Sequence, residues 1–226
     1  MLNILIPCFN EEKVIKKSIE KILNWSEAKD FYVQLIIINN NSTDKTLDEL
    51  RSFKNIENIL ITEETNKGKG YAIKKGLIES QFNNILILDA DLSTDVDQFN
   101  DKWLKENELL ILGSRPLGNE SNTPIKRKIA GKVLNFILRK TFNFKILDTQ
   151  CGFKYLTTQH LEDITKEIST GGFLYDLDMI LSSLKHGVTI KEEAVDYYFD
   201  SDSSVSLIKD SILMLKDMYN LKQKYS

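Results

Sequence analysis

The sequence predicts a single α/β domain built on a mostly parallel sheet. Short apolar runs that suit buried strands alternate with segments in which apolar residues recur at helical spacing. This alternation is typical of a parallel sheet whose strands are joined by right-handed helical crossovers. The length of 226 residues fits one large α/β domain, and ten glycines and three prolines leave no room for a long flexible linker.

The first half of the chain supplies five predicted strands, which are the apolar runs 2–6, 33–38, 59–61, 85–88 and 109–112. Helices are expected between them, over 14–23, around 47–50, over 72–77 and over 95–106. Ser42 or Thr43 is expected to cap the second of these helices, because a hydroxyl can accept hydrogen bonds from its free N–H groups.

The second half opens with a strongly basic segment. Residues 126–145 carry seven basic residues and no acid, with apolar side chains interleaved. Such a cationic amphipathic helix suits an anionic membrane surface, or packing on the sheet with a solvated basic face, and one helix can do both. The remaining expected elements are a polar turn over 148–154, a helix over 173–186, a strand over 188–195 and an amphipathic helix over 203–223.

Composition is that of an ordinary globular protein, with 42% hydrophobic residues, 28% charged residues and a net charge of −3. No stretch approaches the length of about eighteen uncharged apolar residues that suggests a transmembrane helix, and the first residues lack the basic segment of a signal peptide. Cys8 and Cys151 lie far apart in the sequence. They are expected to be reduced thiols of a cytosolic protein.

Asp89 and Asp91 directly follow the fourth predicted strand, whose apolar residues suit a strand buried on both faces. In an open α/β sheet, ligands collect just beyond the carboxyl ends of the strands. Carboxylate oxygens are the ligands that hard divalent cations prefer, so the pair predicts a metal site. Aspartate is also common in turns after strands, and the pair alone is therefore a weak signal.

The pair is one of seven short motifs that occur along the chain. They are Ile6-Pro-Cys-Phe-Asn-Glu-Glu12, Asn41-Ser-Thr-Asp44, Asn66-Lys-Gly-Lys-Gly70, Asp89-Ala-Asp91, Gly113-Ser-Arg115, Asp148-Thr-Gln-Cys-Gly-Phe-Lys154 and Tyr175-Asp-Leu-Asp178. With these motifs in this order, the sequence resembles family 2 glycosyltransferases of the GT-A fold over roughly residues 2 to 222. The sixth motif and residues 203–210 make it similar to the polyprenyl-phosphate (dolichyl-phosphate) glucose and mannose synthases.

The resemblance implies an inverting hexosyltransferase that uses Mg²⁺ or Mn²⁺. It implies a UDP- or GDP-linked sugar as donor, a polyprenyl phosphate as acceptor, and peripheral attachment to the cytoplasmic face of a membrane. Residues 1–115 would form the nucleotide-sugar half of the domain, and 116–226 the acceptor half. A homo-oligomer or a membrane-protein partner stays open. Nucleic-acid binding is not expected, since no aromatic platform or known module accompanies the basic segment.

The resemblance also assigns site residues. The implied donor-binding residues are Pro7, Glu11, Asn39, Asn41, Asn66, Lys69, Gly70, Asp89, Ala90, Asp91 and Arg115. The implied metal ligands are Asp89 and Asp91, and the implied acceptor contacts are Arg115, Lys126, Arg127 and Gln150. The catalytic candidates are Asp91 and, for a general base, Asp176, Asp178 or Asp148. The base stays open, because an acid at the start of a helix also favours that helix by its charge alone.

The chain departs from the family pattern at two places. Asn39-Asn-Asn41 stands where Asp-Asp-Gly is common, and an asparagine accepts a base N–H without the carboxylate's charge, which leaves the base preference open. Phe199 and Ser204 stand where the family often has histidine and lysine. Two alternatives remain: a glycan acceptor in cell-surface polysaccharide assembly, or a non-catalytic member that binds nucleotide sugar. His160 and His186 lie outside every motif and are interpreted as structural.

Overall fold

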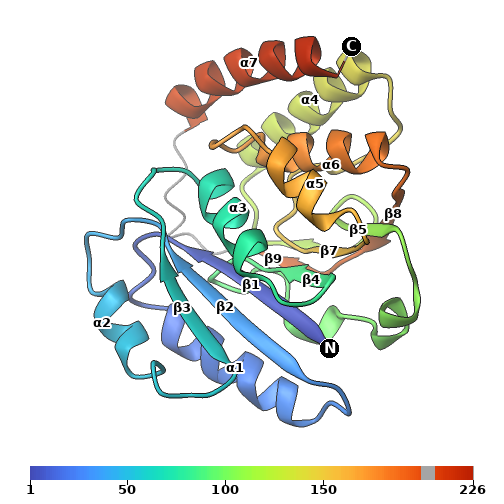
Figure 1. The fold of residues 1–226 in the computed structure, drawn as a ribbon. Coiled ribbons are helices and arrows are strands. Elements are labelled where there is room, and N and C mark those ends of the chain that lie inside the picture. Colours follow the sequence, from blue (N-terminus) through green and yellow to red (C-terminus); the bar gives the residue numbers. More distant parts are fainter. Residues whose placement is uncertain (200–206, 226) are drawn as a thin grey trace.

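A seven-stranded sheet forms the centre of the protein (Figure 1), in the order β3-β2-β1-β4-β7-β5-β8. The computed structural model describes residues 1–199 and 207–225. The strands are β1 (Leu2–Cys8), β2 (Val33–Asn39), β3 (Ile59–Glu63), β4 (Asn84–Ile87), β5 (Leu109–Ser114), β7 (Lys154–Thr157) and β8 (Thr189–Ala194). Within this sheet only β7 runs antiparallel to its neighbours. The predicted α/β class with a mostly parallel sheet is confirmed.

Helices cover both faces of this sheet. The α-helices of the described residues are α1 (Ile15–Glu27), α2 (Thr46–Arg51), α3 (Lys69–Glu79), α4 (Ile125–Phe142), α5 (Leu161–Glu167), α6 (Tyr175–Lys185) and α7 (Leu207–Lys224). Two short 3₁₀ helices, η1 (Val96–Gln98) and η2 (Asp101–Lys105), follow β4. A small second sheet pairs β6 (Glu120–Ser121) with β9 (Tyr197–Tyr198) in parallel.

The central strands are buried on both faces, so their apolar runs pack in two directions. Ile4 and Ile6 of β1 pack with α1 residues such as Ile19, whereas Leu5 packs with α3 and α6 on the opposite face. A third layer lies beyond α6, where α4 and α7 meet it around the buried Leu138. Continuous apolar strands are what a sheet covered on both faces requires.

The single helix predicted over 95–106 is wrong. The structure has two 3₁₀ helices there, and Phe99 between them is extended, with φ −67° and ψ 128°. The Asp95 carboxylate accepts a hydrogen bond from the backbone N–H of Asp97 at 3.1 Å, and the Asn100 side chain does the same for Lys102. Short polar side chains that bond the local backbone in this way compete with a continuous helix.

The predicted cap of α2 is also wrong, because Lys45 is the N-cap residue and the carboxylate that bonds the first turn belongs to Asp44. Its Oδ1 accepts a hydrogen bond from the backbone N–H of Thr46 at 2.9 Å. Ser42 and Thr43 are bonded instead to Asn10, in the loop that follows β1. The run Asn39 to Asp44 therefore joins the ends of β1 and β2 rather than only starting a helix.

The sequence did not predict β7 and α5. β7 has four residues and opens with a lysine, so it lacks the apolar run by which the other strands were found. Its neighbours in the sheet are β4 and β5, and α5 follows it. Among the described residues, none of the helices has the length and apolar content needed to cross a bilayer.

Candidate active site

The carboxyl ends of β1, β2 and β4 bring the predicted donor residues to one edge of the sheet. Cys8, next to Pro7, pairs with Asn39 at the end of β2. Leu5 pairs with Ile87 at the end of β4, and Asp89 follows two residues later. The edge predicted from the strand ends thus assembles Pro7, Asn39, Asp89 and Asp91 from three neighbouring strands.

Asn40 connects this edge to the glycine-rich loop, which is the segment Asn66-Lys-Gly-Lys-Gly70. Its side-chain nitrogen donates to the carbonyl oxygens of Glu64 and Asn66 at 3.1 and 2.7 Å, and its oxygen accepts from the backbone N–H of Gly68 at 2.9 Å. Asn40 is buried, so its side chain holds the loop in place from the interior of the protein. Sequence reasoning noted the three asparagines but did not single out Asn40, since a positioning role gives no spacing signal.

The glycines of this loop are required by close backbone contacts. A side chain at Gly70 would overlap the carbonyl oxygen of Thr170, because a Cβ there would lie only 2.1 Å away. Gly68 has φ +139°, and a Cβ there would lie 2.1 Å from the carbonyl oxygen of Gly171. The backbone N–H of Gly70 donates to Gly171 at 2.9 Å. The loop between β3 and α3 therefore rests directly on the loop before α6.

Asp89 and Asp91 both have polar partners within the protein. The ammonium group of Lys69 lies 2.5 Å from Asp89 Oδ1. Asp91 accepts hydrogen bonds from the backbone N–H and the hydroxyl of Ser93. A Cβ at Gly152 would lie 1.9 Å from Asp89 Oδ2, so this glycine leaves the space that the carboxylate occupies. This close approach of Asp89 explains why the Asp148–Lys154 motif has a glycine at position 152.

The pKa values of the two carboxylates are shifted in opposite directions. Burial and the nearby charge of Asp89 raise the pKa of Asp91 above its usual value. Burial also opposes ionisation of Asp89, but the Lys69 ammonium outweighs it and lowers the pKa of Asp89. A cation placed between the carboxylates would remove the mutual repulsion that raises the pKa of Asp91. The carboxylate oxygens of Asp89 and Asp91 are the hard donors that Mg²⁺ and Mn²⁺ prefer, so these two residues could hold such an ion.

Arg115 and Asp148 form a forked ion pair beside this edge. Arg115 Nε lies 2.7 Å from Asp148 Oδ2, and its Nη2 lies 2.9 Å from Oδ1. Burial alone would raise the pKa of Asp148, but the Arg115 hydrogen bonds and charge hold that pKa below its usual value. Asp148 is therefore ionised and already engaged. This arrangement suits a residue that orients Arg115 better than it suits a general base.

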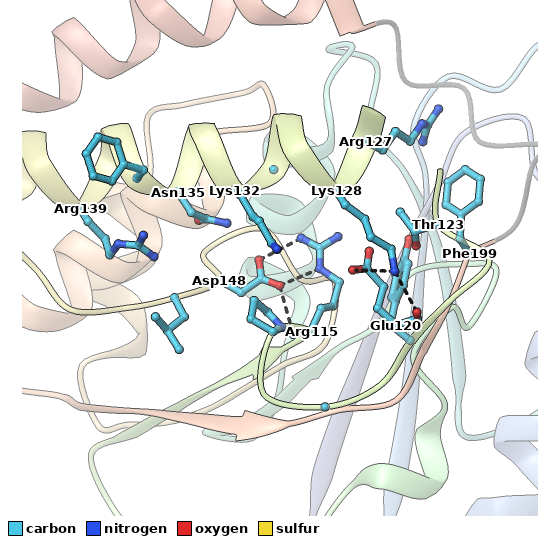
Figure 2. Close-up of a pocket in the computed structure, with 16 residues that line it drawn as sticks. Arg115, Glu120, Thr123, Arg127, Lys128, Lys132, Asn135, Arg139, Asp148 and Phe199 are labelled. Atoms are coloured by element: carbon cyan, nitrogen blue, oxygen red, sulfur yellow. Dashed lines mark hydrogen bonds and ion pairs between the residues drawn. The ribbon is translucent and has the colours of Figure 1, made fainter. Parts of the chain in front are cut away.

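A pocket of about 730 Å³ opens between this ion pair and α4, and Figure 2 shows the side chains that line it. Its basic lining residues are Arg115, Arg127, Lys128, Lys132 and Arg139, against two acids, Glu120 and Asp148. Arg115 is paired with Asp148, and Lys128 lies 3.7 Å from Glu120. Within the described residues, neither Lys132 nor Arg139 forms an ion pair, so the pocket carries uncompensated positive charge.

Only some of the predicted acceptor residues line this pocket. Arg115 and Arg127 line it, whereas Lys126 is exposed and does not. Gln150 lies two residues from Asp148, and its buried amide nitrogen has no hydrogen-bond partner among the described residues. Sequence reasoning missed Lys132 and Arg139 as site residues, because seven basic residues on one helix do not reveal which of them face inward. Phe199 also lines the pocket, but Ser204 lies outside the described residues.

The acidic pair at the start of α6 points in two directions. Asp176 is buried, and its carboxylate lies 2.7 Å from the ammonium group of the equally buried Lys154 of β7. Burial raises the pKa of Asp176, although Lys154 opposes the shift. Lys154 also lowers the pKa of Asp89, so it belongs to the same charged cluster. It was not among the predicted site residues.

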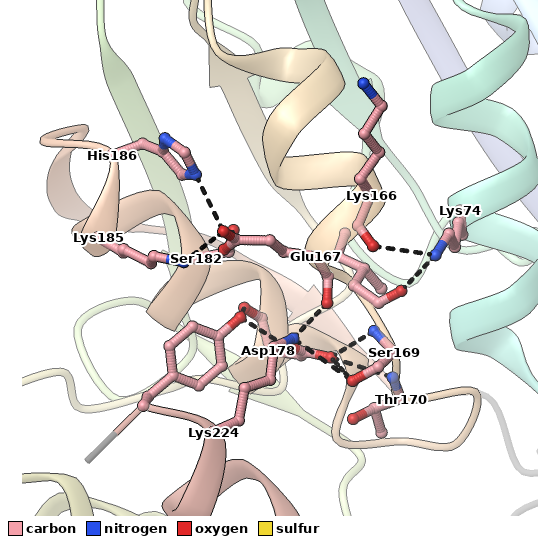
Figure 3. A network of polar contacts seen from close by, with 12 residues as sticks. Lys74, Lys166, Glu167, Ser169, Thr170, Asp178, Ser182, Lys185, His186 and Lys224 are labelled. Carbon is pink, nitrogen blue, oxygen red and sulfur yellow. Dashed lines mark hydrogen bonds and ion pairs between the residues drawn. The ribbon is translucent and has the colours of Figure 1, made fainter.

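Asp178 lies at the centre of a separate network, shown in Figure 3. It accepts hydrogen bonds from the backbone N–H groups of Ser169 and Thr170, and from Lys224 and Tyr225 at the carboxyl end of α7, both at 2.8 Å. It is fully buried. Asp178 therefore holds the loop that supports the glycines and attaches α7 to it, with no oxygen left for a substrate proton.

Comparison with curated proteins gives relatives along almost the whole chain. A dolichyl-phosphate beta-glucosyltransferase, ALG5A, of Trichomonas vaginalis is 28% identical and covers 97% of this chain and 72% of the relative's length. Dolichyl-phosphate beta-glucosyltransferases of Dictyostelium discoideum and Homo sapiens are 29% and 24% identical. Each of these two alignments covers 99% of this chain, and 74% and 75% of the relatives.

Solved structures share the fold. Glucosyl-3-phosphoglycerate synthase from Mycobacterium tuberculosis in complex with UDP superimposes with a TM-score of 0.69 at 16% identity, covering 99% of this chain and 80% of that one. The same enzyme with Mn²⁺, UDP-glucose and glycerol 3-phosphate gives a TM-score of 0.65 at 16% identity, with coverages of 97% and 76%. The predicted GT-A fold is thus confirmed. The family described as glycosyl transferase family 2 matches residues 3–165, and the chain belongs to this family of glycosyltransferases.

Proposed function

We propose that this glycosyltransferase moves a hexose from a UDP- or GDP-linked donor to a dolichyl-type polyprenyl phosphate at the cytoplasmic face of a membrane. The observation that carries the acceptor assignment is the cationic pocket beneath α4, which joins the donor edge at Arg115. A phosphate monoester is the substrate chemistry that such a pocket fits. The relatives named above are dolichyl-phosphate glucosyltransferases, which favours glucose as the sugar and a lipid as the carrier of the phosphate.

The outer face of α4 supports a lipid acceptor. Ile125, Ile129, Val133 and Phe136 recur at helical spacing, and each is more than half exposed. Phe136 also lines the pocket, so the apolar stripe adjoins the phosphate site. With the basic residues of the same helix, this face suits an anionic membrane surface, from which a polyprenyl chain would lead its phosphate into the pocket.

The reaction needs orientation more than proton removal. An oxygen of the acceptor phosphate forms the new bond to the anomeric carbon, while the bond to the nucleoside diphosphate breaks and that group leaves with the electron pair. A phosphate monoester has its second pKa near 6, so its attacking oxygen is already largely deprotonated at neutral pH. Arg115, Lys132 and Arg139 would hold this group, and Asp89 and Asp91 would hold a divalent ion that neutralises the leaving diphosphate as a Lewis acid.

Sugar transfer from a panel of radiolabelled donors to dolichyl phosphate tests this proposal. We expect metal-dependent transfer from one UDP- or GDP-sugar, with UDP-glucose first in the panel, and little transfer to a matched dolichol without phosphate. Transfer to a glycan but not to dolichyl phosphate would replace the lipid acceptor. If a donor at 100 times its Kd raises the stability by the expected amount of about 2.7 kcal/mol with Mn²⁺, but no sugar reaches any acceptor, the non-catalytic alternative would hold.

The pocket makes a second prediction that separates two lysines of one segment. Lys132→Ala should raise the KM for a short-chain polyprenyl phosphate roughly tenfold to a hundredfold, the value of a charge-assisted hydrogen bond, with the donor Kd unchanged. Lys126→Ala is the matched control, because Lys126 is exposed and does not line the pocket. Steady-state kinetics in one detergent would check both. Equal effects of the two substitutions would contradict the pocket assignment.

A further inference from the structure

His160, Asp163 and His186 form a cluster of metal-ligating side chains away from the donor edge. His160 immediately precedes α5, Asp163 lies in the first turn of that helix, and His186 immediately follows α6. One potential ligand atom from each residue lies within 4.8 Å of those from the other two. Among the described residues this is the group of three such side chains close enough to share one ion.

Glu167 supports the orientation of His186. His186 Nε2 lies 3.4 Å from Glu167 Oε1, and Glu167 also accepts hydrogen bonds from Lys185 at 2.5 Å and from Ser182 at 2.7 Å. A histidine whose one ring nitrogen faces a carboxylate presents the other nitrogen as a metal ligand, which is the usual arrangement around bound zinc.

The cluster is separate from the Asp89 and Asp91 site. α5 follows the end of β7, where Thr157 pairs with Asn84, the first residue of β4. Asp89 instead lies two residues beyond Ile87, the last residue of that strand. The His160, Asp163 and His186 cluster and the Asp89 and Asp91 site therefore lie at opposite ends of the strands. An ion bound by the cluster would not contact a donor bound at Asp89 and Asp91.

We propose that His160, Asp163 and His186 bind a Zn²⁺ ion that joins the start of α5 to the end of α6. Two imidazoles and one carboxylate are a donor set typical of zinc, whereas Mg²⁺ and Ca²⁺ prefer all-oxygen sites. A water molecule would complete the tetrahedron. The ion links two helices whose connecting loop carries Ser169 to Gly171, the residues that support the glycine-rich loop.

Zinc binding by the purified full chain, without any histidine tag, tests the site. Isothermal titration with ZnCl₂ should give one ion per chain, with a Kd of about 1 μM or tighter, and Zn²⁺ should raise the melting temperature. His186→Gln, His160→Gln and Asp163→Asn should each weaken binding at least tenfold. Glu167→Gln should weaken it roughly tenfold to a hundredfold without changing the stoichiometry, because it removes the support and not a ligand. Circular dichroism would verify that every variant is folded.

The double variant Asp89→Asn, Asp91→Asn is the matched control, because it removes the other carboxylate pair and should leave zinc binding intact. Co²⁺ offers a spectroscopic measure of the same site, since a four-coordinate nitrogen and oxygen environment gives a strong visible absorption that the three ligand variants should lose. Zinc binding that survives in the three folded ligand variants, that disappears in the control, or that is absent from the unmodified chain would overturn the proposal.

Discussion

Asp91→Ala should reduce sugar transfer by about a thousandfold. Stabilising a departing diphosphate through a bound cation supplies several kcal/mol, and each 1.36 kcal/mol corresponds to a factor of ten in rate. Asp91 and Asp89 follow the same strand, and the charge of Asp89 contributes to raising the pKa of Asp91, so a bound cation would relieve the repulsion between the two carboxylates. The variant should also lose the increase in melting temperature that Mn²⁺ and donor together give the unmodified protein.

Asp176→Asn is the comparison that gives this prediction its mechanistic meaning. Since a phosphate acceptor needs no strong base, this substitution should cost far less activity than Asp91→Ala. Asp176 also lies 2.7 Å from the buried Lys154, so both variants must be assayed at a temperature at which denaturation curves show them folded. Equal losses of activity with the lipid acceptor would contradict the assignment and restore Asp176 as a general base.

Arg115→Ala is expected to lower the free energy of unfolding by about 3 to 5 kcal/mol. Asp148 is 1% exposed, and removal of Arg115 would leave its carboxylate charged and buried without its forked partner. The double variant Arg115→Ala, Asp148→Ala should lose less than the sum of the single changes, because it leaves no isolated charge. The free energy of unfolding of Arg115→Lys should lie between those of the unmodified protein and Arg115→Ala, since an ammonium keeps the charge but cannot form the two-pronged contact. Urea denaturation at pH 7 of the unmodified protein and of the four variants, Asp148→Ala alone included, measures these differences.

The contribution of this pair should depend on pH in one direction. The folded state holds the pKa of Asp148 below its usual value of 3.8. The stabilisation is therefore present at neutral pH and is lost as the pH falls below about 4, where the unfolded chain takes up the proton first. The difference in stability between the unmodified protein and Arg115→Ala should narrow over that range. If Arg115→Ala lowered the free energy of unfolding by less than about 1 kcal/mol at pH 7, the forked ion pair would contribute little to stability.

Much of the fold was predictable because each parallel strand carries its own local signal. Apolar runs such as Leu2 to Ile6 and Val33 to Ile38 are buried on both faces, so hydrophobicity alone identified them. β7 has no such signal, since its Lys154 is buried only because Asp176 neutralises it from another element. The predicted helix over 95–106 failed for the opposite reason, because local hydrogen bonds of Asp95 and Asn100 outweighed the helical spacing.

The site followed the same division. Asp89 and Asp91 could be predicted from their place after a buried strand, but the role of Asn40 depends on three backbone groups of a distant loop. Which basic residues of α4 line the pocket depends on how that helix packs against α6 and α7. Residues that act by position rather than by chemistry become visible only when the elements are assembled.

The place of β7 in the sheet also sets the order in which the protein can fold during synthesis. β1 to β4 can pair as soon as they are made, but the partners of β5 in the sheet are β7 and β8, and β7 begins roughly forty residues after β5 ends. At about 5–20 residues per second, the apolar strand Leu109–Ser114 waits about 2 to 8 seconds for its neighbour. A ribosome that pauses while it translates α4 would lengthen the interval in which β5 is unpaired and prone to aggregate.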